Sequence, residues 1–275
     1  MATPYWAALD EEWDKLKDFC EKQGAFVLKS IQTTADDTLF HLAVFSKSEE
    51  PLKSLLDIAK GDPWTKRLYS KKNIYGNTAL HEAAADGNIK AVRLLMQHDK
   101  ELLKDRNEEG ETPLFKAAAY GQTEGSETAL MLLKLDKSLA TLEDGDGITS
   151  LELLATMPSA FRSGYRMSMW KRLLYFCPLI DAKRRIGLPI LRRILKYKRK
   201  HNLAFKLTLT LIDKDATWVQ IAKKRHSDIF QPPGNKIAIQ AEESEVSKPI
   251  ALFLATERGI LEIVKEILKQ TPQLA

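Results

Sequence analysis

Histidines and cysteines are the residues of this chain best suited to catalysis or metal binding, but their spacing fits neither chemistry. The histidines are His41, His81, His98, His201 and His226. None stands in an H-E-x-x-H pattern or in the Cys/His spacing of a zinc site. Cys20 and Cys177 lie far apart, without a base at a recognisable spacing, so neither a disulfide framework nor a nucleophile is indicated. We expect no catalytic residue and no metal site.

Glycine-rich patterns for phosphate or calcium are also missing from the sequence. Neither G-x-x-x-x-G-K-[ST] nor G-x-G-x-x-G occurs. The run Asp144-Gly145-Asp146-Gly147 superficially resembles a calcium loop, but the glycine at position 6 and the glutamate at position 12 are absent. The sequence therefore predicts a non-enzymatic protein without a cofactor or a small-molecule substrate.

Positive charge is concentrated in one segment. The 275 residues carry 42 Lys and Arg against 37 Asp and Glu, a net charge of +5. Ten of the basic residues and no acidic ones lie between Ala182 and Ile212, so the rest of the chain has a net charge of −5. The ten are Lys183, Arg184, Arg185, Arg192, Arg193, Lys196, Lys198, Arg199, Lys200 and Lys206.

This basic segment has several possible roles. One is a solvated outer helix face. A second is contact with an anionic membrane, to which each clustered Lys or Arg contributes roughly 1 kcal/mol. An acidic protein partner is a third. Nucleic acid is not expected, because no aromatic platform or reading motif accompanies the charge.

Targeting signals are not evident. The segment Met1–Trp6 has neither a basic n-region nor an apolar h-region, so it predicts no signal peptide. No window of about 18 uncharged apolar residues predicts a transmembrane segment. We expect the chain on the cytoplasmic side, with plasma-membrane association in a longer form.

A repeated pattern runs through much of the chain. The reference unit is GNTALHEAAADGNIKAVRLLM, from Gly76 to Met96, and similar runs begin at Thr38, Thr112 and Thr149. Ala7, Trp13 and Leu16 at one end, and the run 252–268 at the other, keep the same register. Units are therefore expected near residues 2, 38, 78, 112, 149 and 250. Self-similarity at this period is typical of a solenoid.

Each repeat unit is predicted to form a turn followed by two helices. Asn73 and Gly76 are turn residues, and Thr78 stands where a helix N-cap is needed. An alanine-rich first helix ends at Gly87, and the second helix buries the apolar stripe that starts at Val92. His41 and His81 share one slot, where an imidazole is expected to bridge the backbones of adjacent turns. No unit encloses its own apolar face, so neighbours must stack.

These runs resemble known repeats. TALHEAAADGNIKAVRLL and TPLFKAAAYG resemble ankyrin repeats. LFLATERGILEIVKEIL, residues 252–268, together with TLFHLAV, residues 38–44, and an N-terminal Trp-containing unit, resembles plant ankyrin proteins that end in a PGG domain with membrane-spanning helices. That family includes accelerated-cell-death-like proteins. The chain stops at Ala275, inside a repeat and without a PGG motif. The resemblance implies an all-α ankyrin-repeat solenoid, with β-turn fingers joining right-handed helix–turn–helix units.

The middle of the chain departs from this regularity. We expect ankyrin repeats over 1–157, an irregular helical and basic insertion over 158–247, and a further repeat over 248–275. Four extra residues within 123–128 predict a bulged loop. The expected elements of the insertion are a helix over 167–177, a basic amphipathic helix over 186–195, a helix or strand over 203–212, with helix favoured by the resemblance, and a loop over 227–247. The tryptophans Trp6, Trp13, Trp170 and Trp218 are expected in the core or as capping aromatics.

The favoured function is a protein-interaction module in plant stress or immune signalling, through the variable positions of turns and inner helices. The partner-binding candidates are Ile74, Tyr75, Asn77, Glu82, Asp86, Glu108, Glu109, Glu111, Lys116 and Tyr120. The alternative is the cytosolic part of a membrane-associated protein whose basic helix, 183–206, contacts anionic lipids. The lipid or acidic-partner candidates are Lys183, Arg184, Arg185, Arg192, Arg193, Lys196, Lys198, Arg199 and Lys200.

Overall fold

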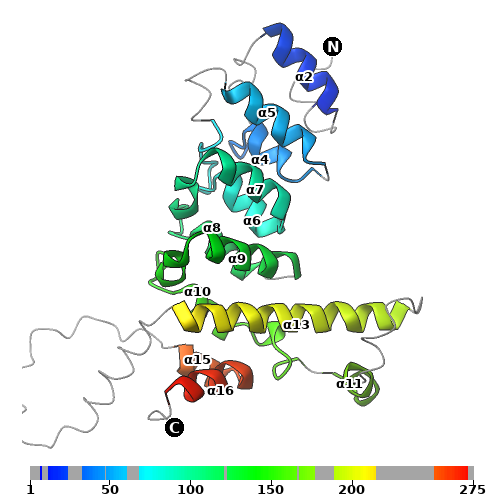
Figure 1. The fold of residues 1–275 in the computed structure, drawn as a ribbon, viewed down its shortest axis with the longest axis vertical. Helices are drawn as coiled ribbons and strands as arrows, with labels where there is room; N and C mark the ends of the chain where they lie inside the picture. The colour runs from blue at the N-terminus through cyan, green and yellow to red at the C-terminus, as the bar shows by residue number, and fades with distance from the viewer. Residues whose placement is uncertain are drawn as a thin grey trace, which may run out of the picture. The chain divides into compact units, whose positions relative to one another are not determined.

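Among the residues that the structure describes, the regular elements are all helical (Figure 1). The computed structural model describes residues 7, 12–23, 33–46, 48–60, 68–120, 123–165, 167–176, 189–214 and 251–271. These residues form two units: unit 1 holds 1–139 and 143–146, and unit 2 holds 140–142 and 147–275. The expected all-α ankyrin-repeat solenoid is confirmed. Predictions on Trp6, Cys177, residues 183–188, Trp218 and 227–247 lie outside the described residues.

Unit 1 is a stack of helix pairs. Its helices are α2 (Trp13–Gln23), α4 (Leu39–Ala43), α5 (Glu50–Lys60), α6 (Ala79–Asp86), α7 (Ile89–His98), the 3-10 helix η2 (Glu101–Lys104), α8 (Pro113–Ala119) and α9 (Thr123–Leu135). A second 3-10 helix, η3 (Lys137–Thr141), follows α9. The first helices contact one another, α4 with α6 and α6 with α8, and the second helices do the same, α5 with α7 and α7 with α9. Helix α2 packs on α5 at the end of this stack.

Local chemistry sets where the first helices begin and end. Thr38, Thr78 and Thr112 are N-caps with extended backbone, and Pro113 occupies the first turn of α8, where a missing N–H has no cost. Gly87 ends α6 in the left-handed conformation, with φ +79°. The alanines between these caps are small and largely buried, so α6 and α8 pack closely against each other.

The extra residues 123–128 form helix and not the expected loop, so that prediction is wrong. They make the first part of α9, which is 13 residues long where α7 has 10. Gly125 makes this possible, because a Cβ atom there would lie 2.8 Å from the backbone oxygen of Ala117. Ser126, Thr128 and Ala129 are buried. The added residues therefore pack against α8 as helix.

Unit 2 repeats the packing pattern with a different second helix. Its elements are α10 (Ser150–Ala155), η4 (Pro158–Ala160), α11 (Met169–Phe176), α13 (Pro189–Lys214), α15 (Ala251–Glu257) and α16 (Leu261–Gln270). Helix α10 contacts α13 and α15, α15 contacts α16, and α13 contacts α16. The same relations link α6, α7, α8 and α9 in unit 1. The second helix that packs on α10 is therefore supplied by α13.

Helix α13 joins two segments that the sequence suggested as separate. The helix runs from Pro189 without a break through 203–212, so the helical interpretation of that segment is confirmed and the strand alternative is wrong. His201, Ala204, Thr208 and Leu211 are buried, at the three- and four-residue spacing of one helix face. This face is buried against the other helices of unit 2. The stabilisation from that burial outweighs the strand preference that the alternating pattern indicates.

Candidate protein-binding surface

The turns that precede the first helices α4, α6, α8 and α10 are here called fingers, and an asparagine side chain closes the two fingers before α6 and α8. Asn73 Oδ1 accepts hydrogen bonds from the backbone N–H groups of Tyr75 and Asn77, both at 3.0 Å. Asn107 Oδ1 accepts from Glu109 at 3.1 Å and from Glu111 at 2.8 Å. An asparagine can satisfy two amides of a tight turn in this way, so the backbone of both fingers is held in one conformation.

Neighbouring fingers are joined through their backbones. One hydrogen bond links each successive pair: Ile74 N to Ala35 O at 3.0 Å, Glu108 N to Tyr75 O at 3.1 Å, and Gly145 N to Glu109 O at 2.8 Å. The approach is close, because a Cβ atom on Gly76 would lie 2.4 Å from the nitrogen of Glu108. Gly76 also has φ +73°, a backbone conformation that is unfavourable for residues with a Cβ atom. Four fingers of unit 1 therefore form one connected row.

Two buried histidines fasten the fingers to the first helices. His81 Nδ1 accepts a hydrogen bond from the backbone N–H of Thr78 at 3.1 Å, and His81 Nε2 lies 3.1 Å from the carbonyl oxygen of Glu111. His41 makes the same pair of contacts, to Thr38 N and to Asn77 O. The expected bridging role is confirmed. Burial lowers the pKa of His81 to about 4, so the imidazole is neutral at pH 7.

Asn77 and Glu111, expected at the surface, are instead buried between the fingers. Asn77 Nδ2 donates to Glu82 Oε1 at 2.8 Å, and Asn77 Oδ1 accepts from Asn107 at 3.0 Å. Glu111 Oε2 accepts from Asn107 at 2.7 Å and pairs with Lys116 at 2.8 Å. Burial alone would raise the pKa of Glu111, but the bonds from Lys116 and Asn107 outweigh it and lower that pKa. Both side chains stabilise the fingers through these bonds and do not face solvent, so they are not part of the proposed contact surface.

The remaining candidates divide between exposed and half-buried positions. Ile74, Tyr75, Glu108, Glu109 and Tyr120 are exposed. Asp86 on α6 is exposed as well, and the inner helices place Glu82 and Lys116 half-buried beside these residues. The ammonium of Lys116 lies 5.5 Å from the centre of the Tyr120 ring. Burial, and then the nearby carboxylate of Glu124, raise the pKa of Asp86.

The finger tips carry a distinct chemistry. Acidic side chains are exposed on the first, third and fourth fingers, and an apolar pair is exposed on the second. We call this set the finger-tip surface; it consists of Asp36, Ile74, Tyr75, Glu108, Glu109 and Asp146. Its side chains project from the connected row of fingers, so they are presented in a fixed order.

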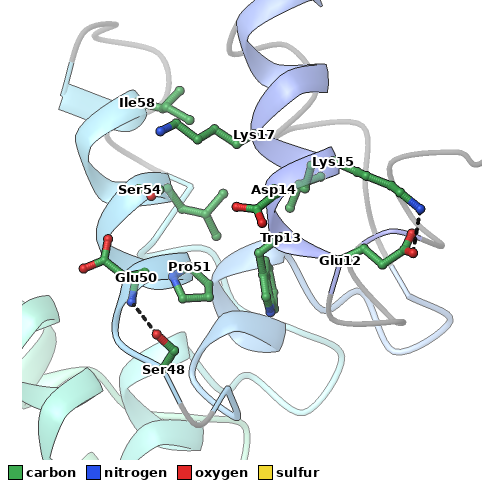
Figure 2. A pocket seen from close by; sticks show the side chains of 12 residues that line it. Glu12, Trp13, Asp14, Lys15, Lys17, Ser48, Glu50, Pro51, Ser54 and Ile58 are labelled. Carbon is green, nitrogen blue, oxygen red and sulfur yellow. Dashed lines mark hydrogen bonds and ion pairs between the residues drawn. The ribbon is translucent and has the colours of Figure 1, made fainter.

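A hollow of about 560 Å³ lies between α2 and α5 of the same unit (Figure 2). Trp13 and Asp14 point into it from α2, and Pro51 lies on the α5 side (Figure 2). Trp13 Nε1 is buried and has no hydrogen-bond partner within the described part of the chain. Acidic and basic side chains, among them Glu50 and Lys17, line it together. This mixture does not select one class of ligand.

The basic candidates lie in unit 2, on the first half of α13. Arg192, Arg193, Lys196 and Arg199 are exposed, and Lys198 and Lys200 are half-buried. Lys183, Arg184 and Arg185 lie outside the described residues. Nowhere in the described ranges do three His, Cys, Asp or Glu side chains come together as a metal site. Among the helices of those ranges, none has both the length and the apolar character to cross a membrane.

One surface, on α11, was not predicted from the sequence. Trp170 was expected in the core or as a capping aromatic, but it is exposed, and so are Met169, Leu173 and Phe176. Their spacing correctly indicates a helix with an apolar face. The same spacing describes a helix that faces a core, so no signal in the sequence separates the two cases.

Stacked helix pairs joined by hydrogen-bonded fingers are the arrangement of ankyrin repeats, and comparison with a family model finds such repeats in part of the chain. Residues 40–141 match the family model of ankyrin repeats, in three copies. Ankyrin repeat domains are generally non-catalytic interaction modules. No curated protein matches the chain. Among solved structures, the chain is similar to a chain in the crystal structure of the yeast ribosomal protein Rps3 in complex with its chaperone Yar1. That similarity has 25% sequence identity and a TM-score of 0.43, and covers 48% of this chain and 89% of the other.

Proposed function

We propose that unit 1 binds a basic, partly apolar segment of a partner protein through the finger-tip surface. The observation that carries this proposal is the exposure of Ile74 and Tyr75 on one finger, directly beside Glu108 and Glu109 on the next. Aromatic side chains are frequent anchors of protein interfaces, and flanking carboxylates select and orient Lys or Arg side chains.

Rigidity of the fingers supports the same function. Tyr75 and Glu109 each lie in a turn closed by an asparagine, and Tyr75 O is bonded to Glu108 N. A surface that is ordered before binding loses less conformational entropy when the partner docks. The half-buried Glu82 and Lys116, with the exposed Asp86 and Tyr120, extend the contact onto the inner helices.

The proposed setting is plant stress or immune signalling. It is supported by the resemblance of residues 252–268 and 38–44 to the plant PGG-domain ankyrin proteins. Proximity labelling in plant cells tests this setting. Labelled proteins drawn from stress or immune signalling are the expected result, and a labelled set without them contradicts it.

A charge-reversal experiment tests the binding surface itself. A fluorescent peptide of alternating lysine and leucine is titrated with the chain, and binding is followed by anisotropy. Glu108→Lys/Glu109→Lys is expected to weaken binding about tenfold or more, because two carboxylates become repulsive. The control is Asp57→Lys, an exposed acid on α5. Equal binding by the wild type and both variants contradicts the proposal.

A second candidate function is contact between α13 and anionic lipids. Arg192, Arg193, Lys196 and Arg199 are exposed at positions that fall on one face of the helix. Such a face is attracted to acidic headgroups. Co-sedimentation with vesicles of phosphatidylcholine and phosphatidylserine tests it. Binding lost in Arg192→Glu/Arg193→Glu/Lys196→Glu is expected, and a wild-type chain that does not sediment with them contradicts it.

A further inference from the structure

Helix α11 turns its apolar face outward. Met169, Trp170, Leu173 and Phe176 are 82%, 79%, 66% and 47% exposed, and their spacing puts them on one side of the helix. The other side holds Tyr175, which is buried with its hydroxyl 3.0 Å from His201 Nδ1. Helix α11 is thus fastened to α13 by its polar contact while its largest apolar side chains meet solvent. Exposed apolar patches of this kind mark interaction sites.

The sequence around α11 is strongly basic, and two arginines lie beside its apolar face. Between Pro158 and Ile212 the chain has 14 basic residues and one acidic residue, Asp181. Arg172 is exposed on α11 itself, and the guanidinium of Arg162 lies 4.3 Å from the centre of the Phe176 ring. Exposed Trp, Leu and Phe beside arginines are the composition of helices that lie in a membrane interface.

We propose that α11 inserts its apolar face into the headgroup region of an anionic bilayer, an inference that rests on the second candidate function. Trp170 and Leu173 enter the boundary between headgroups and acyl chains, where a tryptophan ring is favoured. Arg192, Arg193 and Lys196 hold the acidic headgroups.

An anionic bilayer fits this surface better than a second copy of the chain does. The bilayer offers negative charge and apolar volume together. A second copy docked face to face would bring the two sets of basic residues toward each other, and like charges across an interface disfavour association.

The test separates insertion from electrostatic attraction. The full chain is mixed with vesicles of phosphatidylcholine and phosphatidylserine, and with vesicles of phosphatidylcholine alone. Trp170→Ser/Leu173→Ser is compared with Leu261→Ser, which removes another exposed apolar side chain, from α16 of the same unit. Lipids brominated near the headgroup report tryptophan insertion by quenching fluorescence, and Trp170→Phe assigns the signal among the five tryptophans.

Insertion predicts binding to the acidic vesicles, a loss of about tenfold in the double variant, and little change in Leu261→Ser. It also predicts quenching that Trp170→Phe removes. If the double variant binds as the wild type does, without quenching, while charge reversal on α13 still abolishes binding, the lipid contact stands and insertion by α11 is wrong. If the wild type does not bind, both are wrong. A wild-type dimer that the double variant converts to a monomer, seen by light scattering, assigns the face to self-association and overturns the proposal.

Discussion

In unit 1 each second helix follows its first helix closely, whereas in unit 2 helix α10 ends at Ala155 and the helix that packs on it begins at Pro189. The contacts among α10, α13, α15 and α16 are nevertheless those among α6, α7, α8 and α9. A repeat stack therefore requires an apolar helix face at the second position, and a long connection to that helix is tolerated. In unit 2 this connection carries α11, and the helix that follows it, α13, carries the basic residues.

The N-terminal caps of the first helices also differ between the two units. In unit 1, His81 joins its own cap to the carbonyl of Glu111 on the next finger. In unit 2, Glu152 occupies the equivalent position, where Thr149 N donates to Glu152 Oε2 at 2.8 Å and Glu152 N donates to Thr149 Oγ1 at 3.3 Å. These bonds close the cap within one turn. Unit 1 is therefore expected to unfold more cooperatively along its fingers than unit 2.

The largest expected difference concerns two glycines of similar backbone conformation. Gly76→Ala in unit 1 should cost about 4 kcal/mol, because a left-handed alanine is strained and its Cβ would overlap the backbone of Glu108. Gly259→Ala in unit 2 should cost only about 1 kcal/mol. Its φ is +70°, so alanine is strained there too, but among the described residues no atom beyond its chain neighbours would lie within 4 Å of the added Cβ. Urea unfolding of both variants measures the difference. Equal costs would show that finger contact adds nothing to the strain.

Acid should loosen both units through buried histidines. The pKa of His81 is lowered from 6.5 to about 4 by burial, so between these values the unfolded chain binds more protons than the folded chain. The stability that comes from keeping His81 neutral is therefore complete above pH 6.5. As pH falls toward 4, the free energy of unfolding decreases by about 3 kcal/mol. Burial lowers the pKa of His201 in unit 2 to about 4 as well.

Variants assign this acid sensitivity to each unit. Hydrogen exchange read separately over α6–α8 and α13–α16 should show that His81→Gln reduces the acid-induced loosening of unit 1 alone. His201→Gln should do so for unit 2 alone. Loosening of unit 1 that is unchanged in His81→Gln would assign it to other groups.

Loss of a finger asparagine should cost more than loss of the local cap in unit 2. Asn107→Ala removes bonds to Asn77, Glu109 and Glu111, and is expected to destabilise unit 1 by about 2 kcal/mol. Glu152→Ala removes a half-exposed cap and should cost about 1 kcal/mol. Thermal unfolding followed by circular dichroism compares them. The reverse order would show that the bridges between fingers are dispensable.

The smallest effects are expected at the two proposed contact surfaces. Tyr75→Ser in unit 1 and Trp170→Ser in unit 2 should each change the free energy of unfolding by less than about 0.5 kcal/mol, because both side chains are exposed. The same two variants should weaken peptide binding and vesicle binding respectively. A large loss of stability in either would mean that the residue belongs to the core.

The repeat register could be predicted from the sequence because its signals are local. Thr78 as an N-cap, Gly87 as a left-handed helix end and His81 as a bridge each depend on residues a few positions away or on the similar neighbouring repeat. Burial of Asn77 and Glu111 could not be predicted in this way. A polar side chain in a turn is equally suited to solvent, and only the adjacent finger decides whether it is covered.

Sequence alone thus determined the helical repeats, their caps and the concentration of basic residues between Ala182 and Ile212. Tertiary structure decided which partner each amphipathic face meets. It turned residues 123–128 into helix, made α13 the second helix of the unit begun by α10, and left α11 with Trp170 facing outward. The physical reason is that periodicity records the existence of an apolar face, while its burial depends on segments distant in the chain.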